Sequence, residues 1–156
     1  MMMKNLNFLA ILVIGTFTFL SFQGCDKDKD EIIEDITPEI SCKLSGVEWE
    51  TNVAAGLTSS IVAITATKGK EVILLSIPAK EVGDYPIDII TTNASYTPII
   101  DSISNTYLAF EGEVKITSIN TLRTQIQGSF NFKAANATTL DTIHITEGVL
   151  KNIPMK

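Results

Sequence analysis

Histidine and cysteine, the residues most often used in metal centres and thiol chemistry, are scarce in this 156-residue chain. There is one histidine, His144, and there are two cysteines, Cys25 and Cys42, with no Cys-x-x-Cys motif. This excludes a site that needs two imidazoles and removes the usual signature of structural zinc and thiol-redox centres. No Gly-x-Ser-x-Gly turn is present to hold a nucleophilic serine. We therefore expect no metal, no cofactor and no enzymatic activity.

Basic residues are also few. Twelve Lys and Arg stand against 18 Asp and Glu, which gives a net charge of −6 and a sequence pI near 4.7. We expect no nucleic-acid partner, because binding to phosphates needs clustered Lys and Arg. Seven of the acids and only two lysines lie in residues 26–39, which have no sustained apolar pattern. Such a segment cannot bury enough surface to fold, so we expect residues 25–39 to form a flexible acidic tether.

Charge is absent from most of the first 24 residues. Lys4 is followed by 21 uncharged, mostly apolar residues before Asp26, which is the order found in a secretory signal peptide. An apolar run of this length is also long enough to stay in the bilayer as a transmembrane anchor. The sequence at the end of the run decides which alternative we favour.

The apolar run ends in Ser21-Phe22-Gln23-Gly24-Cys25 and is followed at once by charged residues. A small residue before a cysteine at such a border resembles a bacterial lipobox, although leucine is more common than Phe22 at its position. The resemblance implies that residues 1–24 are a lipoprotein signal peptide and that Cys25 is acylated as the first residue of the mature chain. Several acyl chains, palmitate among them, would attach the protein stably to a membrane without spanning it.

The remaining residues, 40–156, are rich in β-branched side chains, with 17 Ile and 15 Thr. From Leu122 to Ala134 the even positions are mainly apolar and the odd positions polar, which predicts a long strand with one buried face and a bend at Gly128. Similar segments recur, and residues 52–60 are expected to hold only a short turn. The sequence predicts an all-β domain, an antiparallel β-sandwich of about eight strands, or alternatively a closed or partly open, lipocalin-like barrel. The other predicted strands cover residues 40–44, 47–51, 61–67, 71–77, 106–111, 113–119, 140–146 and 149–153.

Most reactive side chains in this domain have an ordinary structural explanation. Cys42 shares the apolar phase of its strand and is expected to be a buried, inert thiol. His144 lies on a polar phase and is expected to be exposed and passive. Two pairs of glutamates, Glu48 with Glu50 and Glu111 with Glu113, are expected to be solvated residues on a sheet face rather than the acid and base of a glycosidase.

The aromatic residues give the best indication of ligand binding. Trp49, Phe130 and Phe132 fall on buried phases and are assigned to the core. Tyr85, Tyr96 and Tyr107 lie in or beside loop sequence, where a ring can stack on a sugar or on a protein partner. We name these three tyrosines as candidate ligand contacts, with simple packing at the rim of the domain as the alternative.

Several motifs together carry a resemblance to one family. Trp49 after a glycine turn, Gly128-Ser129-Phe130-Asn131-Phe132 and Ile145-Thr146-Glu147-Gly148 look like small Bacteroidota lipoproteins classed as domains of unknown function. The resemblance implies an outer-membrane protein, displayed on the cell surface, and brings no activity with it. Asp101-Ser102-Ile103 and Asp141-Thr142-Ile143 also look like acceptors of Bacteroidota protein O-glycosylation, which makes Ser102 and Thr142 candidate modification sites.

These observations lead to one expected function and one alternative. We expect a surface-exposed lipoprotein whose non-catalytic domain binds an envelope or extracellular ligand, such as a glycan. The alternative is a structural or accessory envelope protein that contacts another protein through an exposed sheet edge or loop.

Overall fold

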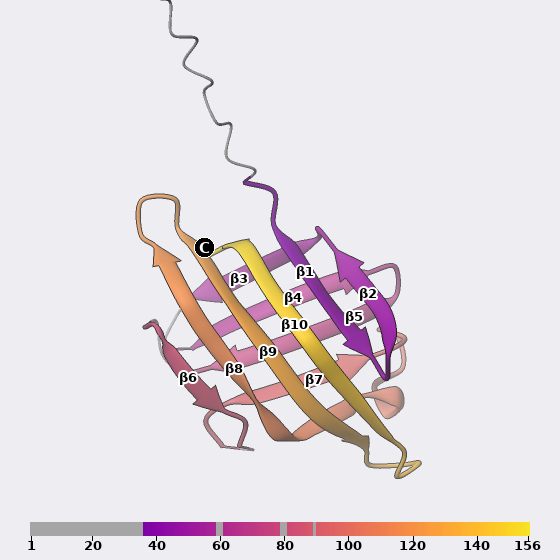
Figure 1. Cartoon of the computed structure of the whole chain (residues 1–156). Coiled ribbons are helices and arrows are strands. Elements are labelled where there is room, and N and C mark those ends of the chain that lie inside the picture. Colours follow the sequence, from indigo (N-terminus) through magenta and orange to yellow (C-terminus); the bar gives the residue numbers. More distant parts are fainter. Residues whose placement is uncertain (1–35, 59–60, 79–80, 89) are drawn as a thin grey trace, which may run out of the picture. The chain divides into compact units, whose positions relative to one another are not determined.

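The computed structural model describes residues 36–58, 61–78, 81–88 and 90–156 (Figure 1). This part of the chain contains ten strands and one short 3-10 turn, η1 (Ile103–Asn105). The all-β prediction is confirmed. The strands are β1 (Glu39–Leu44), β2 (Val47–Thr51), β3 (Ala54–Thr58), β4 (Val62–Lys68), β5 (Glu71–Ile77), β6 (Gly83–Pro86), β7 (Asn93–Thr97), β8 (Tyr107–Asn120), β9 (Gln125–Asn136) and β10 (Thr142–Pro154).

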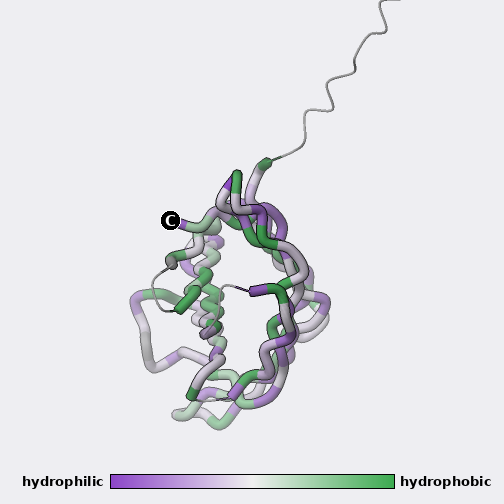
Figure 2. The backbone as a smooth tube through the Cα atoms, turned by 90° about the vertical axis from the view of Figure 1, so that its left-hand side faces the viewer, coloured by the Kyte–Doolittle hydropathy of each residue, from purple (hydrophilic) through white to green (hydrophobic). Residues whose placement is uncertain are grey.

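All the described strands belong to one sheet in which neighbouring strands are antiparallel. Its order is β2-β1-β10-β9-β8-β7-β5-β4-β3, and β6 pairs with the second half of β8. The sheet curls so that β1, β8, β9 and β10 lie across from β3, β4, β5 and β7 (Figure 1). Viewed from the side, the two walls face each other around a common interior (Figure 2). Of the two predicted architectures, the nearly closed barrel describes this sheet.

The two edge strands of the sheet, β2 and β3, are consecutive in the chain. Thr51 Oγ1 donates a hydrogen bond to the carbonyl oxygen of Thr67 at 2.7 Å, and the Thr67 amide donates to Val53 at 3.0 Å. On the other side of β3, Gly56 forms a parallel bridge with Met155, and the Lys156 amide donates to the Gly56 carbonyl at 3.0 Å. The sheet is therefore closed partly by the bend between β2 and β3 and partly by the C-terminal residues.

The predicted alternation in residues 122–134 is confirmed within β9. Ile126, Phe130, Phe132 and Ala134 are buried, whereas the intervening residues face outward. The strand begins at Gln125 rather than at Leu122, because Asn120 Oδ1 accepts hydrogen bonds from the amides of Leu122 and Arg123 and so forms a turn. Leu122 is 97% exposed in that turn.

Several predicted boundaries differ from the structure. The two strands predicted at residues 106–111 and 113–119 are one strand, β8, which continues past a bulge between Ala109 and Glu111. Gly112, with φ of 142°, stays in the ladder and pairs with Phe132. The last two predicted strands are likewise one strand, β10, with a bulge between Ile145 and Gly148. The turn expected in residues 52–60 is wrong, since this segment contains β3. The short strands β6 and β7 had not been predicted.

Apolar side chains from both walls fill the interior. Trp49 and Cys42 belong to this core, as the sequence predicts, together with Phe130 and Phe132, whose ring centroids are 6.3 Å apart. Burying one such aliphatic or aromatic side chain contributes about 1.5–3 kcal/mol. The largest fully buried residues come from both walls: Ile40, Ile64, Ile73, Leu75, Ile77, Ile116, Ile126, Phe132, Ile145, Leu150 and Ile153.

Gly128 provides a test of how closely the strands approach. The pairing of β9 with β8 and with β10 shifts register beside Gly128. A Cβ atom at Gly128 would lie 2.2 Å from the Lys115 carbonyl oxygen. We predict that Gly128→Ala lowers the free energy of unfolding in urea by about 1–3 kcal/mol, because the strands must move apart. Gly83→Ala is the matched control, since its nearest neighbour would be 3.7 Å away, and should change stability by about 0.5 kcal/mol or less. Equal effects would contradict this explanation.

Candidate functional site

Three connections meet at one end of the sheet, which we call the loop end. They are the turn at residues 69–70, the loop at residues 98–106 and the turn at residues 137–141 (Figure 1). The Ile100 amide donates to the Lys70 carbonyl at 2.9 Å, and Asn136 Nδ2 donates to the Ser104 carbonyl at 2.9 Å. Hydrogen bonds between these connections give the loop end a defined shape.

A polar cluster lies in the interior just beneath the loop end. Glu71 has the same phase as Ile73, Leu75 and Ile77, so its carboxylate points inward. Trp49 Nε1 donates to Glu71 Oε2 at 2.7 Å, and the Tyr96 hydroxyl donates to Glu71 Oε1 at 2.9 Å. Each carboxylate oxygen thus has its own donor, which offsets the cost of placing a charge beside an apolar core. We call Trp49, Glu71 and Tyr96 the Glu71 cluster.

Burial determines the acid–base state of two groups near this cluster. The pKa of Tyr96 is raised, first by burial and then by its hydrogen bond to Glu71. Burial also raises the pKa of the Cys42 thiol to about 12. At neutral pH both groups are protonated, so Cys42 is the inert thiol that its apolar position predicts.

The structure separates the three tyrosines named as ligand contacts. Tyr107 opens β8 beside the loop at residues 98–106 and is half-buried, as expected for a rim residue. Tyr96 lies next to the end of β7, beside the same loop, but it faces the interior and is only 8% exposed. The Tyr96 and Tyr107 rings are neighbours, with centroids 6.3 Å apart. Tyr96 is therefore a support for Tyr107 rather than an exposed ring.

Tyr85 does not join this pair. It lies within the short strand β6, beside Val114 of β8, and its hydroxyl donates to the Glu81 carbonyl at 2.7 Å. Tyr107 and Val114 are seven residues apart along the same strand, which corresponds to about 23 Å. Tyr96 and Tyr107 thus form a pair at the loop end, and Tyr85 lies apart from them.

The other predicted sites fall in different parts of the chain. Ser102 lies in the loop at residues 98–106, half-buried, with its hydroxyl 3.1 Å from that of Ser104. Thr142 is exposed at the start of β10, so both candidate glycosylation residues are at the loop end and remain predictions. Cys25 and the proposed signal peptide lie outside the described residues.

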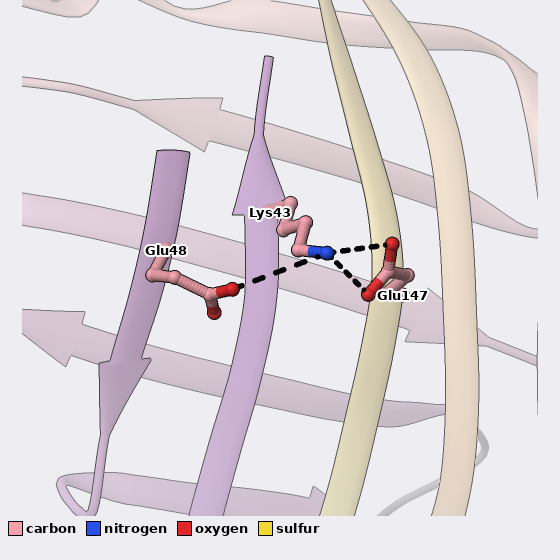
Figure 3. A network of polar contacts seen from close by, with 3 residues as sticks. All are labelled: Lys43, Glu48 and Glu147. Carbon is pink, nitrogen blue, oxygen red and sulfur yellow. Dashed lines mark hydrogen bonds and ion pairs between the residues drawn. The ribbon is translucent and has the colours of Figure 1, made fainter. Parts of the chain in front are cut away.

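The outer surface of β1, β2 and β10 carries a network of ion pairs. Lys43 Nζ lies 2.7 Å from Glu147 Oε2 and 4.0 Å from Glu48 Oε1, so one lysine links three strands (Figure 3). The hydrogen bond from Lys43 to Glu147 raises the pKa of the lysine. Glu111 pairs with Lys133 at 3.0 Å, and His144 is exposed on the neighbouring strand β10, where it pairs in register with Lys133.

Two hollows at the surface are lined by described residues. One, of about 460 Å³, lies between the start of β1 and the end of β2 and includes Glu39 and Glu50. The other, of about 100 Å³, crosses β8, β9 and β10 beside His144 and Lys133. Within the described ranges, no group of three His, Cys, Asp or Glu is placed to hold a metal ion. In those same ranges, no helix has the length and apolar character to cross a membrane.

Tyr96 and its hydroxyl provide a test of the Glu71 cluster. We predict that Tyr96→Phe lowers the free energy of unfolding at pH 7 by about 1.5–3 kcal/mol, because it removes a hydrogen bond to a charged group. Tyr85→Phe, which removes a hydroxyl bonded to an exposed carbonyl, should cost less than about 1 kcal/mol. A smaller cost for Tyr96→Phe than for Tyr85→Phe would argue against the cluster.

The raised pKa of Tyr96 also predicts an alkaline dependence. Below pH 10, the ordinary value, the phenol is protonated in both folded and unfolded chains. Above pH 10 the unfolded chain ionises first, so the wild-type protein loses stability as the pH rises toward the folded pKa, by up to about 1.4 kcal/mol per pH unit from this group. Urea unfolding between pH 9 and pH 11.5 should show a smaller loss in Tyr96→Phe.

Comparison with known proteins places the chain in a family. The family model described as "Domain of unknown function (DUF6252)" matches residues 36–154, and the chain therefore belongs to this family. The matched region includes nearly all of the described sheet. Neither the curated proteins nor the solved structures gave a match to the chain.

Proposed function

We propose that this member of the DUF6252 family is a lipid-anchored protein of the bacterial envelope that binds a ligand outside the outer membrane without catalysis. The lipobox-like sequence that ends at Cys25 supports the anchor, and the apolar residues before it support a signal peptide. The acidic residues 26–39 lead from Cys25 directly to β1, so they would act as the tether of the domain. The resemblance to Bacteroidota lipoproteins supports display on the cell surface.

The observation that carries the binding proposal is the combination of apolar and aromatic residues at the loop end. Ile99, Ile100 and Leu140 are exposed there, the last by 79%, and Tyr107 lies beside the loop. Apolar and aromatic residues on loops at the end of a rigid sheet are typical of binding surfaces. The ligand class that we favour is a glycan, because the apolar face of a sugar ring can stack on Tyr107.

A protein partner is the second candidate, and a different surface favours it. Among the described strands β2 is an edge strand, hydrogen-bonded to β1 on one side, and Val47 in it is 70% exposed. An edge of this kind can accept a strand from another protein. Such binding would not depend on Tyr107.

The anchor has a direct test. We predict that Cys25→Ala moves the protein from the membrane fraction to the soluble fraction or leaves it as an unprocessed precursor of higher mass, because no acyl chain can be attached. Wild-type protein should be in the membrane fraction and should be digested when protease is added to intact cells. Membrane retention of the wild type at the full unprocessed mass would instead support a transmembrane anchor.

The binding surface has a separate test. We predict that Tyr107→Ala abolishes or strongly weakens binding of the wild-type protein to glycans on an array, by about tenfold or more if stacking contributes 1.5 kcal/mol. Tyr85→Ala is the matched control, since Tyr85 is also half-buried but lies away from the loop end. A fixed protein partner that is retained by both variants would favour the second candidate. Equal loss in both variants would contradict a site at the loop end.

A further inference from the structure

The strand β2 is the outermost strand of its wall and pairs with β1 on one side only (Figure 1). Other edges of the described sheet are less suited to a further strand. Beyond β3, the Gly56 carbonyl already accepts the Lys156 amide, and Gly56 forms a bridge with Met155. The four-residue strand β6 includes Pro86, which has no amide to donate. This leaves β2 as the edge to which another strand can be added most readily.

The turn before β2 determines which of its backbone groups point to the open edge. Ser45 and Gly46 both have positive φ, 48° and 90°, as in the type I′ turn of a two-residue hairpin. The residues that flank such a turn, Leu44 and Val47, exchange both backbone hydrogen bonds, and this pattern repeats at every second residue. Val47 and every second residue after it therefore bond to β1, and the residues between them point their amides and carbonyls to the open edge.

The residues between them are Glu48 and Glu50. In the described part of the chain, their amides and carbonyls have no backbone partner. Their side chains are exposed on the outer surface. The Glu48 side chain is 81% exposed, and Lys43, at 4.0 Å, is bound more closely to Glu147, at 2.7 Å (Figure 3). The same two glutamates thus offer free backbone groups and accessible carboxylates.

Val47 shows that the sheet lacks a neighbour at this edge. It has the same inward phase as Trp49, which is only 2% exposed, yet Val47 is 70% exposed. Its partner on β1, Leu44, is half-buried. The inward face of β2 is open to water here because no described strand lies beyond it. A strand added to β2 would cover Val47, and the burial of its apolar side chain would favour the addition.

We propose that the open edge of β2 pairs with an extended segment of another protein in which Lys or Arg alternates with apolar residues. The segment residues opposite Glu48 and Glu50 exchange backbone hydrogen bonds with them and lie on the same outer face, with Cβ atoms about 5 Å from those of the glutamates. Lys or Arg at both positions forms two cross-strand ion pairs. The residue between them points inward beside Trp49 and is apolar, because side chains alternate along a strand.

Charge selects such a segment over other strands. An acidic strand is repelled by the two glutamates, and a neutral strand brings no partner for their carboxylates. Residues 36–156 contain 12 acids and 9 basic residues, a net charge of −3, which attracts a basic segment. The hollow of about 460 Å³ at the end of β2 is lined by Glu39 and Glu50, and it has room for a long basic side chain.

This inference rests on the second candidate function, a protein partner at β2, and names the chemistry of that partner. It does not depend on the lipid anchor or on glycan binding at the loop end. The same glutamates prevent two copies of β2 from pairing with each other, because four carboxylates would meet without a cation. The edge is therefore closed to its own kind and open to a basic strand.

Binding of short peptides to the full chain in detergent tests the proposal. The peptide Val-Lys-Val-Lys-Val, blocked at both ends, should bind to the wild-type chain. An analogue with methyl groups on both lysine amide nitrogens keeps both charges but lacks the donors that face β2, so its binding should be abolished. Val-Thr-Val-Thr-Val should bind about threefold to thirtyfold more weakly than the lysine peptide, because two cross-strand ion pairs are missing.

Substitutions in the protein test the same pairs from the other side. Glu50→Lys should weaken binding of the lysine peptide by about tenfold or more, because like charges would meet across the strands. Glu113→Lys is the matched control, since Glu113 is also exposed but lies on β8 with a strand on each side, and should change the affinity by less than about twofold. Glu48→Lys combined with Glu50→Lys should prefer Val-Glu-Val-Glu-Val to the lysine peptide.

Three results would overturn the proposal. The first is equal binding of the methylated and unmethylated peptides, and the second is an equal effect of Glu50→Lys and Glu113→Lys. The third is equal binding of the lysine and threonine peptides, which would remove the basic partner but retain an edge that accepts strands, as the second candidate function requires. If no peptide binds at millimolar concentration, both this inference and the second candidate function are overturned.

Discussion

The carboxylate of Glu71 joins strands that are far apart in the sheet. β2 lies at one edge of the strand order, whereas β5 and β7 lie near the other, yet Trp49 of β2 and Tyr96 of β7 both donate to Glu71 at the start of β5. A charge beside an apolar core is costly unless its oxygens are hydrogen-bonded, and here both have a donor. The Trp49–Glu71 hydrogen bond holds β2 against the opposite wall, together with the hydrogen bonds that Thr51 and Val53 form with Thr67 at the bend into β3.

The interior and the two outer surfaces of the closed sheet differ in polarity and charge. The interior is mainly apolar, and the Glu71 cluster near the loop end contacts Tyr107 through the ring of Tyr96. The outer surface of β1, β2, β9 and β10 is held by ion pairs, and the outer surface of β3, β4, β5 and β7 is neutral. One curled sheet thus combines a loop end with exposed apolar residues, a charged outer surface and an uncharged outer surface.

Local patterns predict much of this fold, because alternation and turn residues act over short distances. The buried phase of β9 and the places of Trp49 and Cys42 follow from which neighbours are apolar. The strands β3 and β7 are harder to recognise, because Ala-Ala-Gly and Ala-Ser-Tyr have weak contrast between the two faces. The contrast is missing because the outward positions of β3 and β7 carry Ala, Leu, Asn, Ser and Thr in place of charged residues.

The Glu71 cluster depends on long-range contacts that no local pattern reveals. A glutamate beside a Lys-Gly-Lys turn is normally solvated, and only its shared phase with Ile73 hints that it faces inward. Its donors are 22 and 25 residues away. For the same reason Tyr96, which local sequence places near a loop, is a buried support. The proposed location and anchor rest on residues 1–39 and on sequence resemblance rather than on the sheet.

The central structural claim is that Glu71 holds β2 against β5, and a double-mutant cycle between Trp49 and Glu71 tests it most directly. Trp49→Phe, Glu71→Met and the double variant would be compared with the wild-type protein by urea unfolding at pH 7. A hydrogen bond to a charged group predicts a coupling energy of about 1.5–3 kcal/mol between the two sites. A coupling energy near zero would show that the two side chains stabilise the protein independently and would contradict this account of the closure.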